Sequence, residues 1–300
     1  IRPRDWSSDV CSSDLTSYNP AAQFEIKVWD VEFRKTIKRQ LMARIYQPQG
    51  TGPFPVLLDL HGGAWNNKDR HANAPMDEAI AKSGVLVVAI DMTQAPEAPY
   101  PACVQEASYG IRWLKSKAIE WNGDSATLGV LGSSSGGHVA QLLGMRPNDG
   151  RYNVHALPGA PGINSRVAYI ATRSPISDPF ARFKQAEKMK RDHMIKNSTT
   201  FFNPWESIHE ANPQEMLDRG EKVELPPLLI MQGGLDDNVI PVIQEKFSAA
   251  YRKAGGHCQY ELYEGCSHEW VAEPCEATTR AQNMVKGFIA EQLAAGRKAI

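Results

Sequence analysis

The chemistry of this sequence begins at a serine set between two glycines. Ser134 stands in the run Leu131-Gly132-Ser133-Ser134-Ser135-Gly136-Gly137-His138, which follows a short apolar stretch and leads into Val139-Ala140-Gln141-Leu142-Leu143. The pattern Gly-x-Ser-x-Gly between a strand and a helix is typical of a sharp turn that exposes a nucleophilic hydroxyl. Glycine is needed because such a turn leaves no space for a Cβ. A strand-to-helix turn without chemistry is the alternative, since glycine and serine are common in turns.

A second glycine pair follows an earlier apolar stretch. The loop His61-Gly62-Gly63-Ala64-Trp65 comes directly after Val56–Leu60. Acyl transfer requires N–H donors for the oxyanion of its intermediate, and glycines let the backbone approach a substrate closely enough to supply them. We expect the donors to be the N–H groups of Gly63, Ala64 and Ser135, the last being the residue after the nucleophile. The histidine that opens the loop is expected to brace it, and a plain Gly-Gly turn is the alternative.

A general base and an acid to orient it occur later in the chain. His268 lies on a glycine-containing loop directly after the last apolar stretch. Asp236 and Asp237 follow another apolar stretch and precede a helix whose start is marked by Pro241. Position alone leaves both aspartates open. The other histidines do not follow a strand in this way, and His138, on the helix behind the serine turn, is expected to be structural.

Alternating strands and helices must position these residues. Two stretches that alternate polar and apolar residues predict an opening antiparallel hairpin, and the later, continuously apolar stretches predict strands buried on both faces. We expect strands at 24–33, 39–46, 56–60, 85–90, 127–131, 167–171, 227–232 and 258–263, and helices at 72–83, 102–121, 135–145, 241–254 and 276–293. This order indicates an α/β fold with a mostly parallel sheet covered by helices. Each candidate residue follows a strand, so all should meet at one edge of the sheet.

Residues 175–220 interrupt this rhythm. They hold a polar, mostly basic, helix-like run at 180–196, an aromatic segment at 201–205 and a second short helix after Asn212-Pro213. The insertion is too short for a core of its own. We therefore expect a single domain over 16–300 in which the insertion lies across the carboxyl edge of the sheet as a partial lid. Its basic residues are expected to form a solvated helix face, with a binding patch as the alternative.

Aromatic and polar side chains near this insertion have two interpretations each. Trp65, Phe201, Phe202 and Trp205 either line an acyl or aryl pocket or pack the lid, and the sequence does not favour one over the other. The run Ser177-Asp178-Pro179 either contacts substrate or caps a helix, and aspartate before proline favours the cap.

Composition limits the partners and the compartment. The net charge of −1 gives no sign of a nucleic-acid partner, and the apolar runs are too short to span a membrane. No Cys-x-x-Cys pair indicates a metal, and Cys266 and Cys275 are expected to be free thiols, with a local disulfide as the alternative. The repeated tetrads within 1–15 resemble translated sequencing adapter from a metagenomic contig. On that interpretation the natural start is missing, and cytoplasmic, periplasmic and secreted locations all stay open.

These motifs together resemble an α/β-hydrolase of the carboxylesterase and lipase group. The resemblance rests on His-Gly-Gly-x-Trp, Gly-x-Ser-x-Gly, the Asp loop and the His loop in the order of that fold, and it covers Phe24 to Leu293. Relatives include hormone-sensitive-lipase-like esterases, kynurenine formamidases, and acetylxylan or feruloyl esterases. The family spacing Gly-x-x-Asp-x-x-Val favours Asp236 over Asp237. Ala64 and Trp65 depart from the His-Gly-Gly-Gly form, which puts the donor set in doubt.

The resemblance implies a serine ester hydrolase that uses Ser134, His268 and Asp236, without metal or cofactor, on short-chain, aryl or acetyl esters. An arylformamidase with the same three residues is an alternative, and a non-catalytic ligand-binding member of the fold is another. The expected partner is a small ester, and the oligomeric state is open, a homodimer included.

Overall fold

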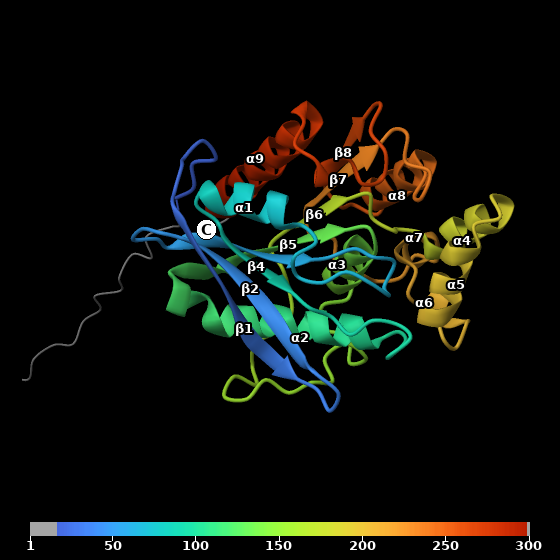
Figure 1. Cartoon of the computed structure of the whole chain (residues 1–300), viewed down its shortest axis with the longest axis horizontal. Coiled ribbons are helices and arrows are strands. Elements are labelled where there is room, and N and C mark those ends of the chain that lie inside the picture. The colour runs from blue at the N-terminus through green and yellow to red at the C-terminus, as the bar shows by residue number, and fades with distance from the viewer. Residues whose placement is uncertain (1–16, 299–300) are drawn as a thin grey trace, which may run out of the picture.

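A single eight-stranded sheet organises the computed structural model, which describes residues 17–298. The segment interpreted as adapter-derived, 1–15, lies outside the described residues. The strand order is β1-β2-β4-β3-β5-β6-β7-β8, and only β2 runs antiparallel to its two neighbours, β1 and β4, in an otherwise parallel sheet (Figure 1). The strands are β1 (Ile26–Lys35), β2 (Gln40–Pro48), β3 (Phe54–Leu60), β4 (Leu86–Ile90), β5 (Gly123–Ser133), β6 (Ile170–Arg173), β7 (Leu228–Gly233) and β8 (Cys258–Tyr263).

Five helices cover the two faces of this sheet. On one face lie α1 (Ala74–Lys82) and α9 (Glu276–Lys298), and on the other lie α2 (Ala102–Lys117), α3 (Ser135–Met145) and α8 (Pro241–Lys253). Short 3₁₀ turns at Ala118–Trp121 and Trp270–Ala272 follow α2 and precede α9. The predicted opening hairpin and the mostly parallel sheet are thereby confirmed.

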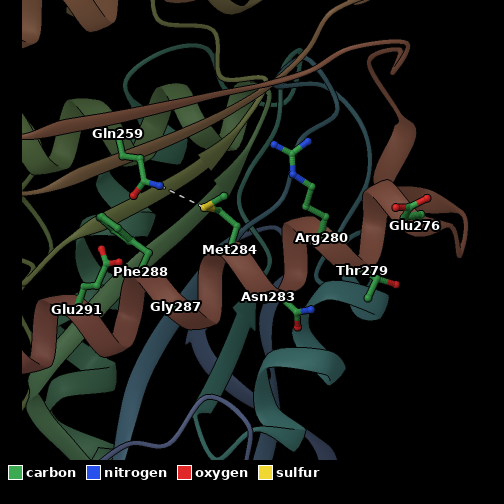
Figure 2. A pocket seen from close by; sticks show the side chains of 9 residues that line it. All are labelled: Gln259, Glu276, Thr279, Arg280, Asn283, Met284, Gly287, Phe288 and Glu291. Carbon is green, nitrogen blue, oxygen red and sulfur yellow. Dashed lines mark hydrogen bonds between the residues drawn. The ribbon is translucent and has the colours of Figure 1, made fainter.

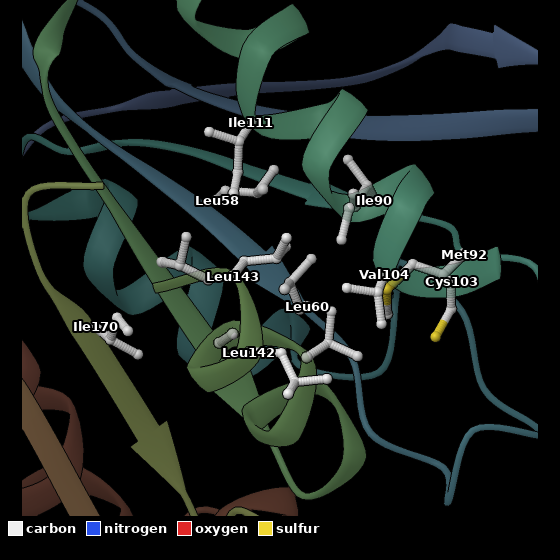
Figure 3. Close-up of a cluster of buried hydrophobic side chains, with 14 of the residues drawn as sticks. Leu58, Leu60, Ile90, Met92, Cys103, Val104, Ile111, Leu142, Leu143 and Ile170 are labelled. Atoms are coloured by element: carbon white, nitrogen blue, oxygen red, sulfur yellow. The ribbon is translucent and has the colours of Figure 1, made fainter. Parts of the chain in front are cut away.

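The two-residue period of the strands divides the core between the faces. Leu58 and Leu60 of β3 pack with Ile90 of β4 against α2 and α3, as Figure 3 shows. Leu57 and Val87, one position along, belong to the core under α1 and α9. Because successive side chains of a strand point to opposite faces, a strand buried on both faces must be apolar throughout.

The insertion forms four helices beside the end of the sheet. They are α4 (Pro179–Lys188), α5 (Asp192–Phe201), α6 (Ser207–Glu210) and α7 (Pro213–Asp218). The helix-like run predicted at 180–196 is wrong as one element, because α4 ends at Lys188 and Lys190 adopts a left-handed φ of 54° before α5 begins. The strand predicted at 167–171 is observed at 170–173, closer to the carboxyl edge of the sheet.

The structure bears on two predictions from the sequence, one for the cysteines and one for membrane-spanning segments. Cys103, Cys258, Cys266 and Cys275 are all free in the described part of the chain, so the disulfide alternative for Cys266 and Cys275 is not realised. Among residues 17–298, every helix is too short or too polar to cross a membrane.

A glycine in β5 offers a test of the packing. A Cβ at Gly129 would lie 2.1 Å from a ring carbon of Tyr169, a distance that forces the ring to move. We expect Gly129→Ala to lower the free energy of unfolding by about 1–3 kcal/mol, because overpacking strains its neighbours. The control is Gly287→Ala in α9, where a Cβ meets nothing within 4 Å and should raise stability by about 0.5–1 kcal/mol. Urea unfolding measures both, and equal midpoints for the two variants would contradict the packing.

Candidate active site

The turn between β5 and α3 holds Ser134 in a strained backbone conformation. Ser134 has φ 50° and ψ −115°, a region that residues with a side chain rarely adopt. A Cβ at Gly136 would lie 2.0 Å from the carbonyl oxygen of Leu60, and one at Gly132 would lie 2.6 Å from that of Gly136. Both glycines of the motif are therefore required by close backbone contacts.

Ser134 begins a chain of hydrogen bonds through His268 to Asp236. The Nε2 atom of His268 lies 3.0 Å from Ser134 Oγ, and its Nδ1 atom lies 2.7 Å from Asp236 Oδ2. Ser134 and His268 are 6% and 8% exposed, and Asp236 is 2% exposed. The three residues come from the ends of β5, β7 and β8 and so meet at the carboxyl edge of the parallel sheet.

Only one of the two candidate aspartates reaches the histidine. Asp236 Oδ1 accepts the N–H groups of Asn238 at 2.9 Å and Val239 at 2.8 Å. Burial acts to raise the pKa of Asp236, but the hydrogen bond and charge of His268 and the N–H of Val239 hold that pKa below its ordinary value. Asp237 is exposed and forms an ion pair with Arg191 of the insertion.

The glycine loop after β3 is a run of left-handed residues beside the serine turn. Gly63, Ala64 and Trp65 have φ values of 103°, 51° and 62°. Trp65 N–H donates to Ser135 Oγ at 3.1 Å, which ties this loop to the first residue of α3. His61 at its start is buried, and its Nδ1 lies 2.7 Å from the carbonyl oxygen of Gly62. As the first residue of α3, Ser135 has an N–H without an intrahelical acceptor.

Trp65 and His138 link this loop to the insertion. Trp65 Nε1–H donates to His138 Nδ1 at 3.2 Å, so Nε2 carries the other proton and donates to the carbonyl oxygen of Ala211 at 2.7 Å. The Trp65 ring also stacks on Phe201 at 4.7 Å, with Phe202 at its edge. Trp65, Phe201 and Phe202 are at most 5% exposed. His138 therefore has a structural role, as expected.

The insertion contacts three loops at the carboxyl edge of the sheet. Asn197 of α5 hydrogen-bonds to Asn66 after β3, and Phe201 accepts the N–H of Tyr100 after β4 at 2.8 Å. Arg182 of α4 donates to Asn238 Oδ1 after β7 at 2.7 Å and 3.0 Å. The predicted cap is also present, because Asp178 Oδ1 accepts the N–H of Ala181. Trp205, which the sequence analysis grouped with the other aromatic candidates, packs against Phe183 of the insertion, with 4.6 Å between the ring centroids.

Two buried arginines close to Asp236 were not identified from the sequence. Arg173 at the end of β6 is 5% exposed and Arg182 is 2% exposed, whereas the basic residues of the insertion were expected on a solvated face. Burial lowers the pKa of both guanidinium groups, and the charge of Asp236 acts in the opposite direction on each. The signal available was a charged residue at the end of the apolar stretch Ile170-Ala171-Thr172.

A separate surface groove of about 720 Å³ runs between β8 and α9. Figure 2 shows its lining, in which Gln259 of β8 contacts Met284 of α9. The lining holds no serine, cysteine or histidine. Among the described residues, no group of three or more His, Cys, Asp and Glu side chains is placed to hold a metal ion.

Comparison with known proteins places this site in a family. The BD-FAE family model matches residues 44–250, which is more than half of the chain and includes the Ser134 turn and Asp236. The chain belongs to the BD-FAE family. As a BD-FAE protein it is similar to the "Probable carboxylic ester hydrolase LipM" of Mycobacterium tuberculosis, at 26% identity over 65% of this chain and 44% of LipM. It is also similar to an AB hydrolase superfamily protein of Schizosaccharomyces pombe, at 27% identity over 77% of this chain and 68% of that protein.

A solved structure confirms the fold of this BD-FAE chain. The propionate-bound esterase of Thermogutta terrifontis superposes with a TM-score of 0.70 at 22% identity, over 90% of this chain and 94% of that one. At this identity the likeness establishes the α/β-hydrolase fold. The chain spans about half the length of the first curated relatives it matches, from 44% of LipM to 52% of the esterase LipC, both from Mycobacterium tuberculosis.

The buried histidine behind the serine turn predicts a pH-dependent stability. Burial lowers the pKa of His138 from 6.5 to about 4. Between these values the unfolded chain binds a proton that the folded chain does not, so the free energy of unfolding falls as the pH decreases through this window. The complete shift corresponds to about 3 kcal/mol.

We therefore expect His138→Gln, which keeps a donor and an acceptor, to lose less stability than the wild type between pH 6.5 and pH 4. Urea unfolding at several pH values provides the measurement. Carboxyl groups titrate in both proteins. The difference between the two curves of stability against pH therefore reports the titration of His138. Parallel curves over this window would contradict the prediction.

Proposed function

We propose that the chain is a serine carboxylic ester hydrolase in which Ser134 is the nucleophile, His268 the general base and Asp236 the acid that orients it. One observation carries the proposal: Ser134, strained at the tip of its turn, hydrogen-bonds to a histidine whose other nitrogen is held by a buried carboxylate. The curated relatives that are carboxylic ester hydrolases and esterases support the same reaction class.

We assign a role in acyl transfer to each of the three side chains. His268 Nε2 accepts the proton of Ser134 Oγ as that oxygen attacks the acyl carbonyl carbon, and then delivers it to the leaving alkoxide. The bond between His268 Nδ1–H and Asp236 keeps the imidazole in the tautomer that this transfer needs. In the second half, His268 removes a proton from water as the water oxygen attacks the acyl carbon, and it returns that proton to Ser134 Oγ as the acyl–Oγ bond breaks and the acid leaves.

The oxyanion of each tetrahedral intermediate needs donors on the other side of Ser134. We assign these to the N–H groups of Gly63, Ala64 and Ser135. The left-handed run at 63–65 and the hydrogen bond from Trp65 N–H to Ser135 Oγ hold the loop against the helix start. Removing one donor of this kind typically reduces the rate by about 10²–10³.

Closely packed aromatic side chains lie beside the glycine loop. Phe201 and Phe202 of the insertion pack against Trp65, and the cavity between Trp65, Met92, Cys103 and Val139 holds only about 10 Å³, about the size of one water molecule. We assign short-chain, acetyl or aryl esters as substrates, with the insertion covering the acyl side of the site.

Paired variants of the two aspartates test the assignment of the acid. Asp236→Asn keeps the size of the side chain but presents the histidine with the wrong tautomer, and kcat should fall by about 10⁴. Asp237→Asn removes only an exposed ion pair with Arg191, so its kcat should stay within about twofold because such pairs contribute little. Initial rates on p-nitrophenyl acetate measure both. Equal losses would contradict the assignment of Asp236.

A substrate series tests the reaction itself. We expect the wild type to hydrolyse p-nitrophenyl acetate and butyrate faster than the dodecanoate. Ser134→Ala should hydrolyse each ester only at the low residual rate that substrate binding alone supports. Turnover of N-formylkynurenine but of no ester would favour the arylformamidase alternative. Retention of ester activity by Ser134→Ala would overturn the proposed nucleophile.

A further inference from the structure

Arg173 is a charged residue where the fold calls for an apolar one. It ends β6, an inner strand of the sheet with the sequence Ile170-Ala171-Thr172-Arg173, and it is 5% exposed. Removing a guanidinium group from water costs several kcal/mol unless it gains partners in the interior. Its partners therefore indicate what the charge is for.

Arg173 contacts the backbone of both the nucleophile and the base. Its carbonyl oxygen accepts the N–H of Ser134 at 2.9 Å. Its side chain reaches in the other direction, and the Nη1 atom donates a hydrogen bond to the carbonyl oxygen of His268. A single residue thus connects the ends of β5 and β8, which are not neighbours in the sheet.

Three carboxylates act on the charge of Arg173. Glu269 is exposed, whereas Asp236 and Asp59 of β3 are buried, Asp59 with 1% exposure. Asn73 donates to both oxygens of Asp59 at 2.9 Å and 3.0 Å. Ser133, the residue before the nucleophile, donates in turn to Asn73 Oδ1 at 2.9 Å. The counter-charge is therefore also anchored to the serine turn.

We propose that Arg173 is a positioning residue that holds the His268 loop at the distance from Ser134 that proton transfer requires. This inference rests on the proposed ester hydrolysis. The hydrogen bond from Arg173 to the carbonyl of His268 fixes the backbone from which the imidazole extends, whereas the hydrogen bond to Asp236 fixes only the ring. A displacement of about 1 Å in such a site costs about 10² in rate.

A purely structural role for Arg173 predicts a different result when its charge and that of Asp59 are removed together. If Arg173 only balanced the charge of Asp59, removing both charges together would restore the protein completely. If Arg173 positions the histidine loop, the double variant would recover stability but not the rate of the chemical step. The carboxylate of Asp59 touches neither Ser134 nor His268 in the hydrogen bonds of the described residues, so the two effects are separable.

The experiment uses Arg173→Met, Arg173→Lys, Asp59→Asn and the double variant Asp59→Asn/Arg173→Met in the full chain. Steady-state kinetics on p-nitrophenyl acetate separate kcat from KM, and intact-mass measurement follows phosphorylation of Ser134 by paraoxon. Ser134→Ala is the control for both, and urea unfolding reports the stability of each variant. The double variant keeps the test valid where Arg173→Met alone does not fold.

The expected result is a loss of about 10² in kcat for Arg173→Met and for the double variant, with KM within about threefold, and a matching loss in phosphorylation rate. Arg173→Lys should regain part of kcat, and Asp59→Asn should keep most of it. A folded double variant with wild-type kcat would overturn the positioning role. Wild-type protein that neither hydrolyses the ester nor reacts with paraoxon would instead overturn the proposed function, and this inference with it.

Discussion

The strained backbone at Ser134 is the constraint on which the rest of the site depends. A residue held at a left-handed φ of 50° costs about 1–3 kcal/mol and persists only where its surroundings enforce it. Here the serine N–H donates to Arg173, and its carbonyl accepts the N–H groups of Ile176 and His138. The turn is thereby fixed from β6, from the start of the insertion and from α3. His268, Asp236 and the glycine loop after β3 all take their positions relative to it.

Buried charge is concentrated at the same edge of the sheet. The charge of Asp236 acts on both Arg173 and Arg182, and all three residues are at most 5% exposed. Charges act over longer distances in such surroundings because water does not screen them. Asp77 has no hydrogen-bond partner for either oxygen, and burial together with the charge of Asp59 raises its pKa well above the ordinary value. Burial also raises the pKa of Asp59, to about 7, although the hydrogen bond from Asn73 and the charge of Arg173 act to lower it.

Much of the fold followed from local pattern. The helix predicted at 135–145 and the strand predicted at 258–263 have the observed bounds, because long apolar periodicity and flanking glycines mark both. The break between α4 and α5 was missed because Lys190, not glycine or proline, takes the left-handed turn. The sequence grouped Trp65 with Phe201 but did not show that their rings stack, because 135 residues lie between them and only the folded insertion brings the rings together.

The sequence by itself determined which residue types follow which strands: a serine between glycines, a glycine loop, an aspartate pair and a histidine, each after an apolar stretch. The parallel sheet then had to gather them at one edge. Only the tertiary structure decided that Asp236 turns inward to His268 while Asp237 meets Arg191 at the surface. It also decided that Arg173 is buried between Ser134 and His268. The reason is physical: the positions of strands and helices along the chain come from local periodicity, whereas the partner of a charged side chain depends on which distant segments exclude water around it.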